Sequence, residues 1–138
     1  MLFFTGFQRN ASDIASTYVA KLTEKSGSLR TLRSMVYECI SILQNELPIR
    51  QFGKLLHQSW EIKRKLGSTI SSNRIDALYD SIMSAGALGG KIMGAGGGGF
   101  LLVCAEPNKQ ERIRYELRNL VYVPFKFEDR GTHILVSN

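Results

Sequence analysis

The run from Gly94 to Gly99 contains five glycines in six positions and constrains this chain more than any other feature. Because glycine has no Cβ atom, such a run can adopt positive φ angles and let a ligand approach the backbone closely. Successive N–H groups in such a turn can form a concave nest for an anion. The alternative is a tight hairpin whose glycines only permit close packing. A plain turn does not need so many glycines, which cost conformational entropy on folding, and we therefore predict an anion-binding loop.

The residues after this loop decide which kind of anion loop it is. Residues 100–105 are continuously apolar, which predicts a buried strand. A P-loop and a dinucleotide-binding fingerprint both require a helix here, so both are excluded, although Gly94, Gly96 and Gly99 match the fingerprint in letters. A protein-kinase glycine loop lies in a strand hairpin, but the partner lysine and catalytic-loop sequences of that class are absent. A strand–glycine loop–strand element of another class remains.

Four helices are predicted before the glycine-rich region, because apolar side chains recur there at helical spacing. The segments are residues 11–22, 29–47, 52 to about 67, and 75–83. Asn10 is a candidate N-cap for the first, Pro48 ends the second, and Ser72 or Asn73 caps the fourth. Gly86 is the expected stop of the fourth helix.

The remaining elements are a short strand at residues 2–4, a helix beginning at Pro107, and two alternating strands at 123–127 and 132–136. The two alternating strands predict a C-terminal hairpin, with Phe125 and Phe127 in the core. The order of elements indicates an α+β fold, in which helices cover one face of a small antiparallel sheet. We expect residues 1–138 to form a single domain.

Composition narrows the function only weakly. The net charge is +6, but the basic residues are interleaved with acidic ones, which is typical of solvated helix faces. Nucleic acid is therefore not favoured as a partner. Cys39 and Cys104 are interpreted as small buried hydrophobes, and no apolar run is long enough to cross a membrane. These features fit a cytoplasmic location.

The glycine element closely resembles the third motif of the GHMP kinases, the family of galactokinase, homoserine kinase, mevalonate kinase and phosphomevalonate kinase. The matching residues are Lys91-Ile-Met-Gly94-Ala-Gly96-Gly97-Gly98-Gly99. The bacterial heptose-7-phosphate kinase branch and its sugar-1-kinase relatives are the more similar group. That similarity rests on these segments: Phe4-Thr5-Gly6 with Arg9, Leu55-Leu56-His57 with Trp60 and Lys63, Ile75-Asp76 with Leu78-Tyr79, and Val123-Pro-Phe-Lys-Phe127.

The resemblance implies the C-terminal half of such an enzyme, a ferredoxin-like sheet with additional helices. It implies phosphoryl transfer from ATP to a sugar hydroxyl, with a heptose 7-phosphate or a similar sugar phosphate as acceptor. In this family the ATP loop, the Mg²⁺-binding residues and the catalytic residues belong to an N-terminal half, which we expect to be missing here. We therefore expect no phosphate transfer by this chain alone, and self-association through the apolar face left exposed.

The resemblance also assigns site residues. It implies that Gly94, Ala95, Gly96, Gly97, Gly98 and Gly99 line the phosphate-transfer cleft. Further candidates for substrate or phosphate contact are Lys91, Thr5, Gly6 and Arg9. The alternative for Lys91 is a solvated side chain, and for Arg9 a surface salt bridge. We interpret Trp60 as a core residue, and His57 and His133 as structural rather than metal ligands.

Two other functions stay open at this point. A small basic α+β domain could bind RNA through aromatic and basic residues on its sheet, although the recognition-strand sequence is missing. A ferredoxin-like domain could also bind a small-molecule effector without catalysing a reaction.

Overall fold

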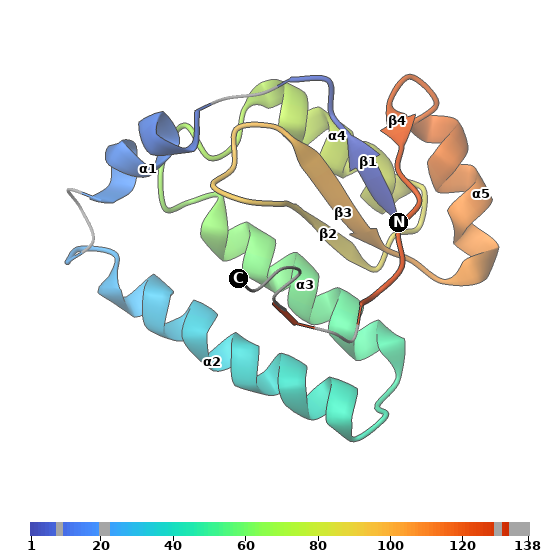
Figure 1. The fold of residues 1–138 in the computed structure, drawn as a ribbon, viewed down its shortest axis with the longest axis horizontal. Coiled ribbons are helices and arrows are strands. Elements are labelled where there is room, and N and C mark those ends of the chain that lie inside the picture. Colours follow the sequence, from blue (N-terminus) through green and yellow to red (C-terminus); the bar gives the residue numbers. More distant parts are fainter. Residues whose placement is uncertain (8–9, 20–22, 129–130, 133–138) are drawn as a thin grey trace, which may run out of the picture.

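Four antiparallel strands form one sheet in the order β2–β3–β1–β4 (Figure 1). They are β1 (Leu2–Phe4), β2 (Gly89–Ile92), β3 (Phe100–Cys104) and β4 (Val121–Tyr122). The computed structural model describes residues 1–7, 10–19, 23–128 and 131–132, so Arg9 and His133 lie outside the described residues. The glycine run joins β2 to β3, which pair with Lys91 opposite Leu102 and Ile92 opposite Leu101. The expected α+β fold is confirmed.

The helices are α1 (Ala11–Val19), α2 (Ser26–Gln44), α3 (Ile49–Lys63), α4 (Asn73–Ser84) and α5 (Pro107–Glu116). The end signals predicted for α4 and α5 are confirmed, whereas α2 ends at Gln44, before Pro48, which is the N-cap of α3. The Ser72 side chain accepts a hydrogen bond from the Ile75 N–H and caps α4, and Gly86 follows α4 with a φ of 101°. Pro107 occupies the first turn of α5, where its missing N–H costs nothing. No helix in the described part of the chain is long and apolar enough to cross a membrane.

The core lies on one face of the sheet. Phe3, Leu101 and Val103 point to this face and are almost completely buried. They pack against apolar residues of α4 and α5 and against Trp60 of α3, which is fully buried and therefore a core residue, as predicted. Cys39 and Cys104 are half-buried rather than fully buried, and both are free thiols.

Two glycines allow α3 to lie against β2, as Figure 1 shows. A Cβ atom on Gly89 would lie 2.1 Å from the carbonyl oxygen of Gly53, and one on Gly53 would lie 2.3 Å from Cβ of Leu88. Neither position tolerates a side chain without a backbone shift. Helix α2 packs on α3 and leaves an apolar stripe exposed, which includes Val36, Ile40 and Leu43.

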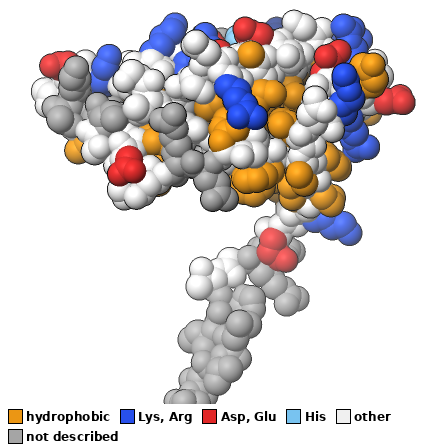
Figure 2. Space-filling view, turned by 90° about the horizontal axis from the view of Figure 1, so that it is seen from above, with side chains coloured by type: hydrophobic (Ala, Val, Ile, Leu, Met, Phe, Trp, Pro, Cys, Tyr) orange, Lys and Arg blue, Asp and Glu red, His pale blue; other side chains and the backbone are white. Residues whose placement is uncertain are grey.

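The predicted strand at 123–127 is wrong, because the pairing ends after β4. The Val123 N–H donates to the carbonyl oxygen of Leu2, and Pro124 then has no N–H to continue the ladder. Phe125 and Phe127 are 45% and 95% exposed, so they are not core residues. Most of the predicted strand at 132–136 lies outside the described residues. Figure 2 shows hydrophobic side chains gathered on one face of the molecule, with basic side chains among and beside them.

Candidate functional site

The glycine run forms the loop of the β2–β3 hairpin, so the predicted strand–loop–strand arrangement is present. Positive φ angles occur at Gly94 and at Gly96, Gly97, Gly98 and Gly99. The hairpin is closed by a hydrogen bond of 2.8 Å from the Met93 N–H to the Phe100 carbonyl oxygen. A backbone with this many left-handed residues is accessible only to glycine.

Part of the loop is used to hold it in place. The Gly97 N–H donates to the carbonyl oxygen of Ile70, and the Gly99 N–H donates to that of Phe7, each at 2.8 Å. A Cβ atom on Gly96 would lie 2.7 Å from the Ile70 carbonyl oxygen, and one on Gly98 would lie 2.5 Å from that of Phe7. The alternative interpretation, that glycines permit close packing, is therefore correct for these positions.

The other side of the loop faces a hollow of about 270 Å³, which we call the loop hollow. It is lined by Gly94–Gly96, Gly98, Gly99, Met93 and Ala11. The N–H groups of Ala95 and Gly98 make no hydrogen bond to another described residue. Ala11 is the first residue of α1, so the positive end of that helix dipole adjoins the hollow. Free N–H donors beside a helix N-terminus are the groups that bind a phosphate oxygen.

Lys63, at the end of α3, also holds the loop. Its ammonium donates to the carbonyl oxygens of Ile92 and Gly94. Because the C=O and N–H of a trans peptide point in opposite directions, this contact turns the Ala95 N–H away from Lys63. Burial, which is the larger cause, and the nearby charge of Lys91 together lower the pKa of Lys63 to about 8. The sequence shows no site role for Lys63, because that role depends on how α3 lies against β2.

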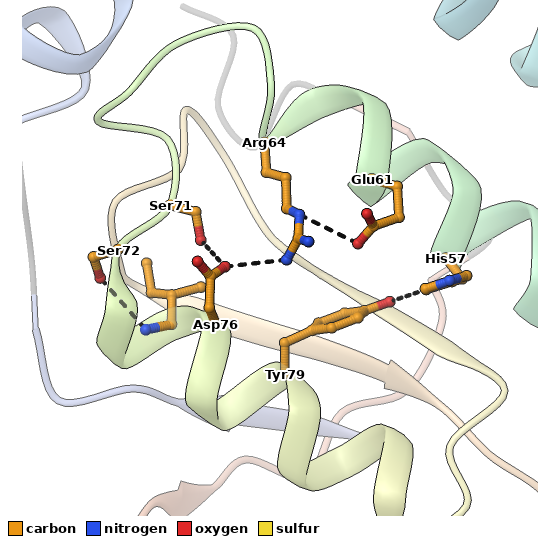
Figure 3. Close-up of polar contacts among 8 residues, drawn as sticks. His57, Glu61, Arg64, Ser71, Ser72, Asp76 and Tyr79 are labelled. Carbon is orange, nitrogen blue, oxygen red and sulfur yellow. Dashed lines mark hydrogen bonds and ion pairs between the residues drawn. The ribbon is translucent and has the colours of Figure 1, made fainter.

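A polar network fixes the segment that supports the loop (Figure 3). The carboxylate of Asp76 accepts hydrogen bonds from Ser71 at 2.6 Å and from Arg64 at 3.2 Å. Arg64 also pairs with Glu61 at 3.2 Å. These contacts connect the end of α3 to the start of α4 and hold the chain on both sides of Ile70, on which the glycine loop rests.

His57 contacts Tyr79 and has no charged partner among the residues that the structure describes. Its Nδ1 lies 2.8 Å from the Tyr79 hydroxyl, and the two rings stack (Figure 3). Burial raises the pKa of Tyr79 to about 12. The described residues contain no cluster of side chains that could hold a metal ion. The contact of His57 with Tyr79 joins α3 to α4.

The other candidate residues are distributed around the loop. Thr5 is fully buried, and its N–H and its hydroxyl both donate to the Gly99 carbonyl oxygen at 2.8 Å. Thr5 thus holds the loop instead of facing a ligand. Gly6 is exposed in the turn after β1, with a φ of 79°. Lys91 is half-buried and lies on the sheet face opposite to the core, and Arg9 lies outside the described residues.

The fold and the loop together define an α+β domain that presents a rigid glycine hairpin beside a helix N-terminus. The family model for the GHMP kinases C terminal matches residues 44–123. The chain therefore belongs to the GHMP kinase C-terminal family.

Curated relatives are larger kinases. The chain is 30% identical over 121 residues to a D-glycero-alpha-D-manno-heptose 7-phosphate kinase of Campylobacter jejuni, covering 86% of this chain and 35% of that protein. It is 32% identical over 120 residues to an L-fucokinase/L-fucose-1-P guanylyltransferase of Bacteroides fragilis, covering 83% and 12%. It is 34% identical over 97 residues to a mevalonate kinase of Thermococcus onnurineus, covering 69% and 28%. The chain thus spans about a third or less of these relatives.

Solved structures share the fold. The mevalonate kinase of Methanococcus jannaschii superposes with a TM-score of 0.70 at 24% identity, over 86% of this chain and 35% of that one. The L. major mevalonate kinase in complex with R-mevalonate gives a TM-score of 0.71 at 18% identity, over 86% and 37%. At these identities the likeness establishes the fold alone.

Proposed function

We propose that this chain is the C-terminal domain of an ATP-dependent sugar kinase, in which the glycine loop forms one wall of the phosphate-transfer cleft. A heptose 7-phosphate or a similar sugar phosphate is the proposed acceptor. The observation that carries the proposal is the loop hollow, because Ala95 and Gly98, whose N–H groups make no hydrogen bond to another described residue, line it beside the start of α1. The similarity to a heptose 7-phosphate kinase and to an L-fucokinase supports the acceptor class.

The described residues fit a phosphate group. The N–H groups of Ala95 and Gly98 are available as donors, and the loop is held by Ile70 and Phe7 before any ligand arrives. In phosphoryl transfer, negative charge spreads over the transferred phosphoryl group. Donors that are already in position stabilise this charge, because they do not have to reorganise during the reaction. ATP would supply that phosphoryl group. This chain would contribute electrostatic stabilisation and positioning. Gly6 and Arg9 remain candidates for contacting the acceptor, and Lys91 remains a candidate for contacting a phosphate group.

The catalytic residues, the nucleotide loop and the Mg²⁺ ligands are proposed to come from an N-terminal kinase domain. The share of the curated relatives that this chain leaves uncovered is consistent with such a partner. We expect the two parts to work in the cytoplasm, where ATP is available. The exposed apolar stripe of α2 supports the expectation that the isolated chain associates with itself.

A charge placed in the loop hollow tests the anion site directly. Ala11 is exposed at the start of α1, so Ala11→Asp adds a carboxylate at a position that favours it for helix stability. Ala11→Asn is the matched neutral control. We expect pyrophosphate to shift the amide signals of Ala95 and Gly98 in ¹H–¹⁵N spectra of the wild type and of Ala11→Asn, and to have little effect in Ala11→Asp. Equal shifts in all three proteins would contradict an anion site here.

A turnover assay tests whether the catalytic groups come from the proposed N-terminal kinase domain. With ATP, Mg²⁺ and a heptose 7-phosphate, the purified 138-residue chain should release no ADP above background. The same chain joined to the N-terminal part of a GHMP kinase relative provides the positive arm. Clear turnover by the chain alone would show that the catalytic groups lie within it.

A further inference from the structure

A second cavity, of about 510 Å³, opens between α2, α3 and the β2–β3 hairpin, and we call it the lysine groove. Most of its lining is apolar, including Leu32, Met35, Val36, Phe52 and Leu55. Its polar lining consists of Ser59 and the two lysines, Lys63 and Lys91. A cavity of this size, with apolar walls and a few convergent polar groups, is typical of a small-molecule site.

The two lysines give the groove a positive charge, and none of the described acidic residues lines it. Among the described residues, neither Lys63 nor Lys91 pairs with a carboxylate. Their charges act on one another, since Lys91 contributes to the lowered pKa of Lys63. Lys63 uses two donors on the loop carbonyls, and an ammonium group has three. An anionic group between Lys63 and Lys91 would relieve their repulsion and accept hydrogen bonds from the remaining N–H groups of both lysines.

We propose that the lysine groove binds a small amphiphilic anion, whose apolar body lies between α2 and α3 and whose phosphate or carboxylate contacts Lys63 and Lys91. A sugar phosphate does not suit this groove, because its hydroxyl groups would lose water against the apolar walls without finding partners. The groove is therefore a site separate from the proposed acceptor site. A neighbouring apolar cavity shares Phe52, Leu56, Met93 and Leu102 with it, but no charged side chain lines that cavity.

The probe is octyl phosphate below its micellar concentration, titrated into the full chain by calorimetry. Octanol and methyl phosphate, which carry only one part of the amphiphile, are the controls. Octyl phosphate should bind at least tenfold more tightly than either, and each methylene between butyl and octyl phosphate should tighten binding by about fourfold. Octanol binding as tightly as octyl phosphate, or affinity independent of chain length, would overturn the proposal.

Variants locate the bound molecule. Lys91→Glu reverses the charge at the groove and should abolish binding, whereas Lys91→Arg should retain it. Val36→Glu places a charge on the groove wall, and Tyr37→Glu places it on the neighbouring exposed position, which does not line the groove. We expect Val36→Glu to weaken octyl phosphate binding about tenfold and Tyr37→Glu to leave it unchanged. Equal effects of the two substitutions would overturn the assignment.

Further measurements distinguish the lysine groove from the loop hollow, and a small bound anion from a second copy of the chain or a membrane surface. Ala11→Asp should leave octyl phosphate binding unchanged, and loss of binding in this variant would place the head group in the loop hollow and overturn the proposal. Sedimentation is measured in parallel. A dimer that Val36→Glu dissociates and octyl phosphate does not would assign the groove to a second copy of the chain. Binding that appears only with anionic lipid vesicles would assign it to a membrane surface.

Discussion

The loop hollow and the lysine groove meet at Met93, yet they are built in opposite ways. The loop hollow is lined mainly by the short segment 93–99, with Ala11 of α1 beside it, and its proposed donors are peptide N–H groups. The lysine groove is lined by side chains from α2, α3 and the hairpin. A backbone site is rigid and independent of side-chain identity, whereas a groove made by three elements depends on how they pack. Lys63 touches both, since it lines the groove and holds the loop.

Among substitutions that distinguish the loop hollow from the lysine groove, we expect the largest effect on stability at Gly96. Gly96→Ala requires a φ of 113° and places a Cβ atom 2.7 Å from the Ile70 carbonyl oxygen. We expect a loss of about 3 kcal/mol in the free energy of unfolding, measured by urea denaturation. Gly94→Ala is the matched control, because its φ of 73° is strained but its Cβ would meet open space, and it should cost about 1 kcal/mol. Equal losses would mean that the loop does not rest on Ile70.

Removing the ammonium group that both sites share should have the next largest effect. Lys63→Met leaves the Gly94 carbonyl without its donor, so the Ala95 N–H loses its fixed direction. We expect pyrophosphate to bind about tenfold more weakly, since a hydrogen bond from a charged group contributes about 1.5 kcal/mol or more. Lys63→Arg should restore most of the affinity. An unchanged affinity in Lys63→Met, measured by calorimetry, would remove Lys63 from the loop site.

The pH dependence of stability gives a smaller and more specific signal. The pKa of Lys63 is about 8 in the folded chain and 10.5 as the ordinary value, so the unfolded chain binds more protons between these pH values. The free energy of unfolding should therefore rise from pH 8 to pH 10.5 in the wild type relative to Lys63→Met. Lys91→Met should flatten this rise, because it removes one cause of the lowered pKa. A falling difference over this range would show that the charged form of Lys63 is favoured by folding.

The smallest effect is expected where the groove meets solvent. Val36 and Tyr37 are 56% and 61% exposed, so Val36→Glu and Tyr37→Glu should each change the free energy of unfolding by less than about 0.5 kcal/mol. Thermal melting of both variants checks this. A large loss in Val36→Glu alone would mean that the groove wall is part of the core, and it would prevent its use as a binding test.

The sequence predicts one of these sites and misses the other for a physical reason. Helical spacing and caps such as Ser72 and Gly86 are local signals, so the helices could be predicted. The glycine loop is equally local. The sequence could not predict which N–H groups of the loop are used within the fold and which are left for a ligand. Gly97 and Gly99 donate to Ile70 and Phe7, which are distant in sequence. The lysine groove has no local signal at all, since it exists only when α2, α3 and the hairpin are packed together.

The C-terminal error has a similar origin. Alternation of Val123, Phe125 and Phe127 is a genuine strand pattern, but a strand also needs a partner with free hydrogen-bonding groups. The ladder between β4 and β1 ends at Val123, and Pro124 cannot extend it. Periodicity describes which side chains share a face, and it does not reveal whether a neighbouring backbone is available.

The same proline has a consequence for how this domain can associate. One edge of the sheet, β2, is covered by α3 through the contact of Gly53 with Gly89, and the other edge, β4, is only two residues long before Pro124. A long, open edge invites strand addition and aggregation, and both edges here are blocked. A partner domain must therefore recognise this chain through the side chains of its faces and loops. Contacts between side chains can distinguish partners that differ in sequence. Hydrogen bonds between backbones at a sheet edge could not do so.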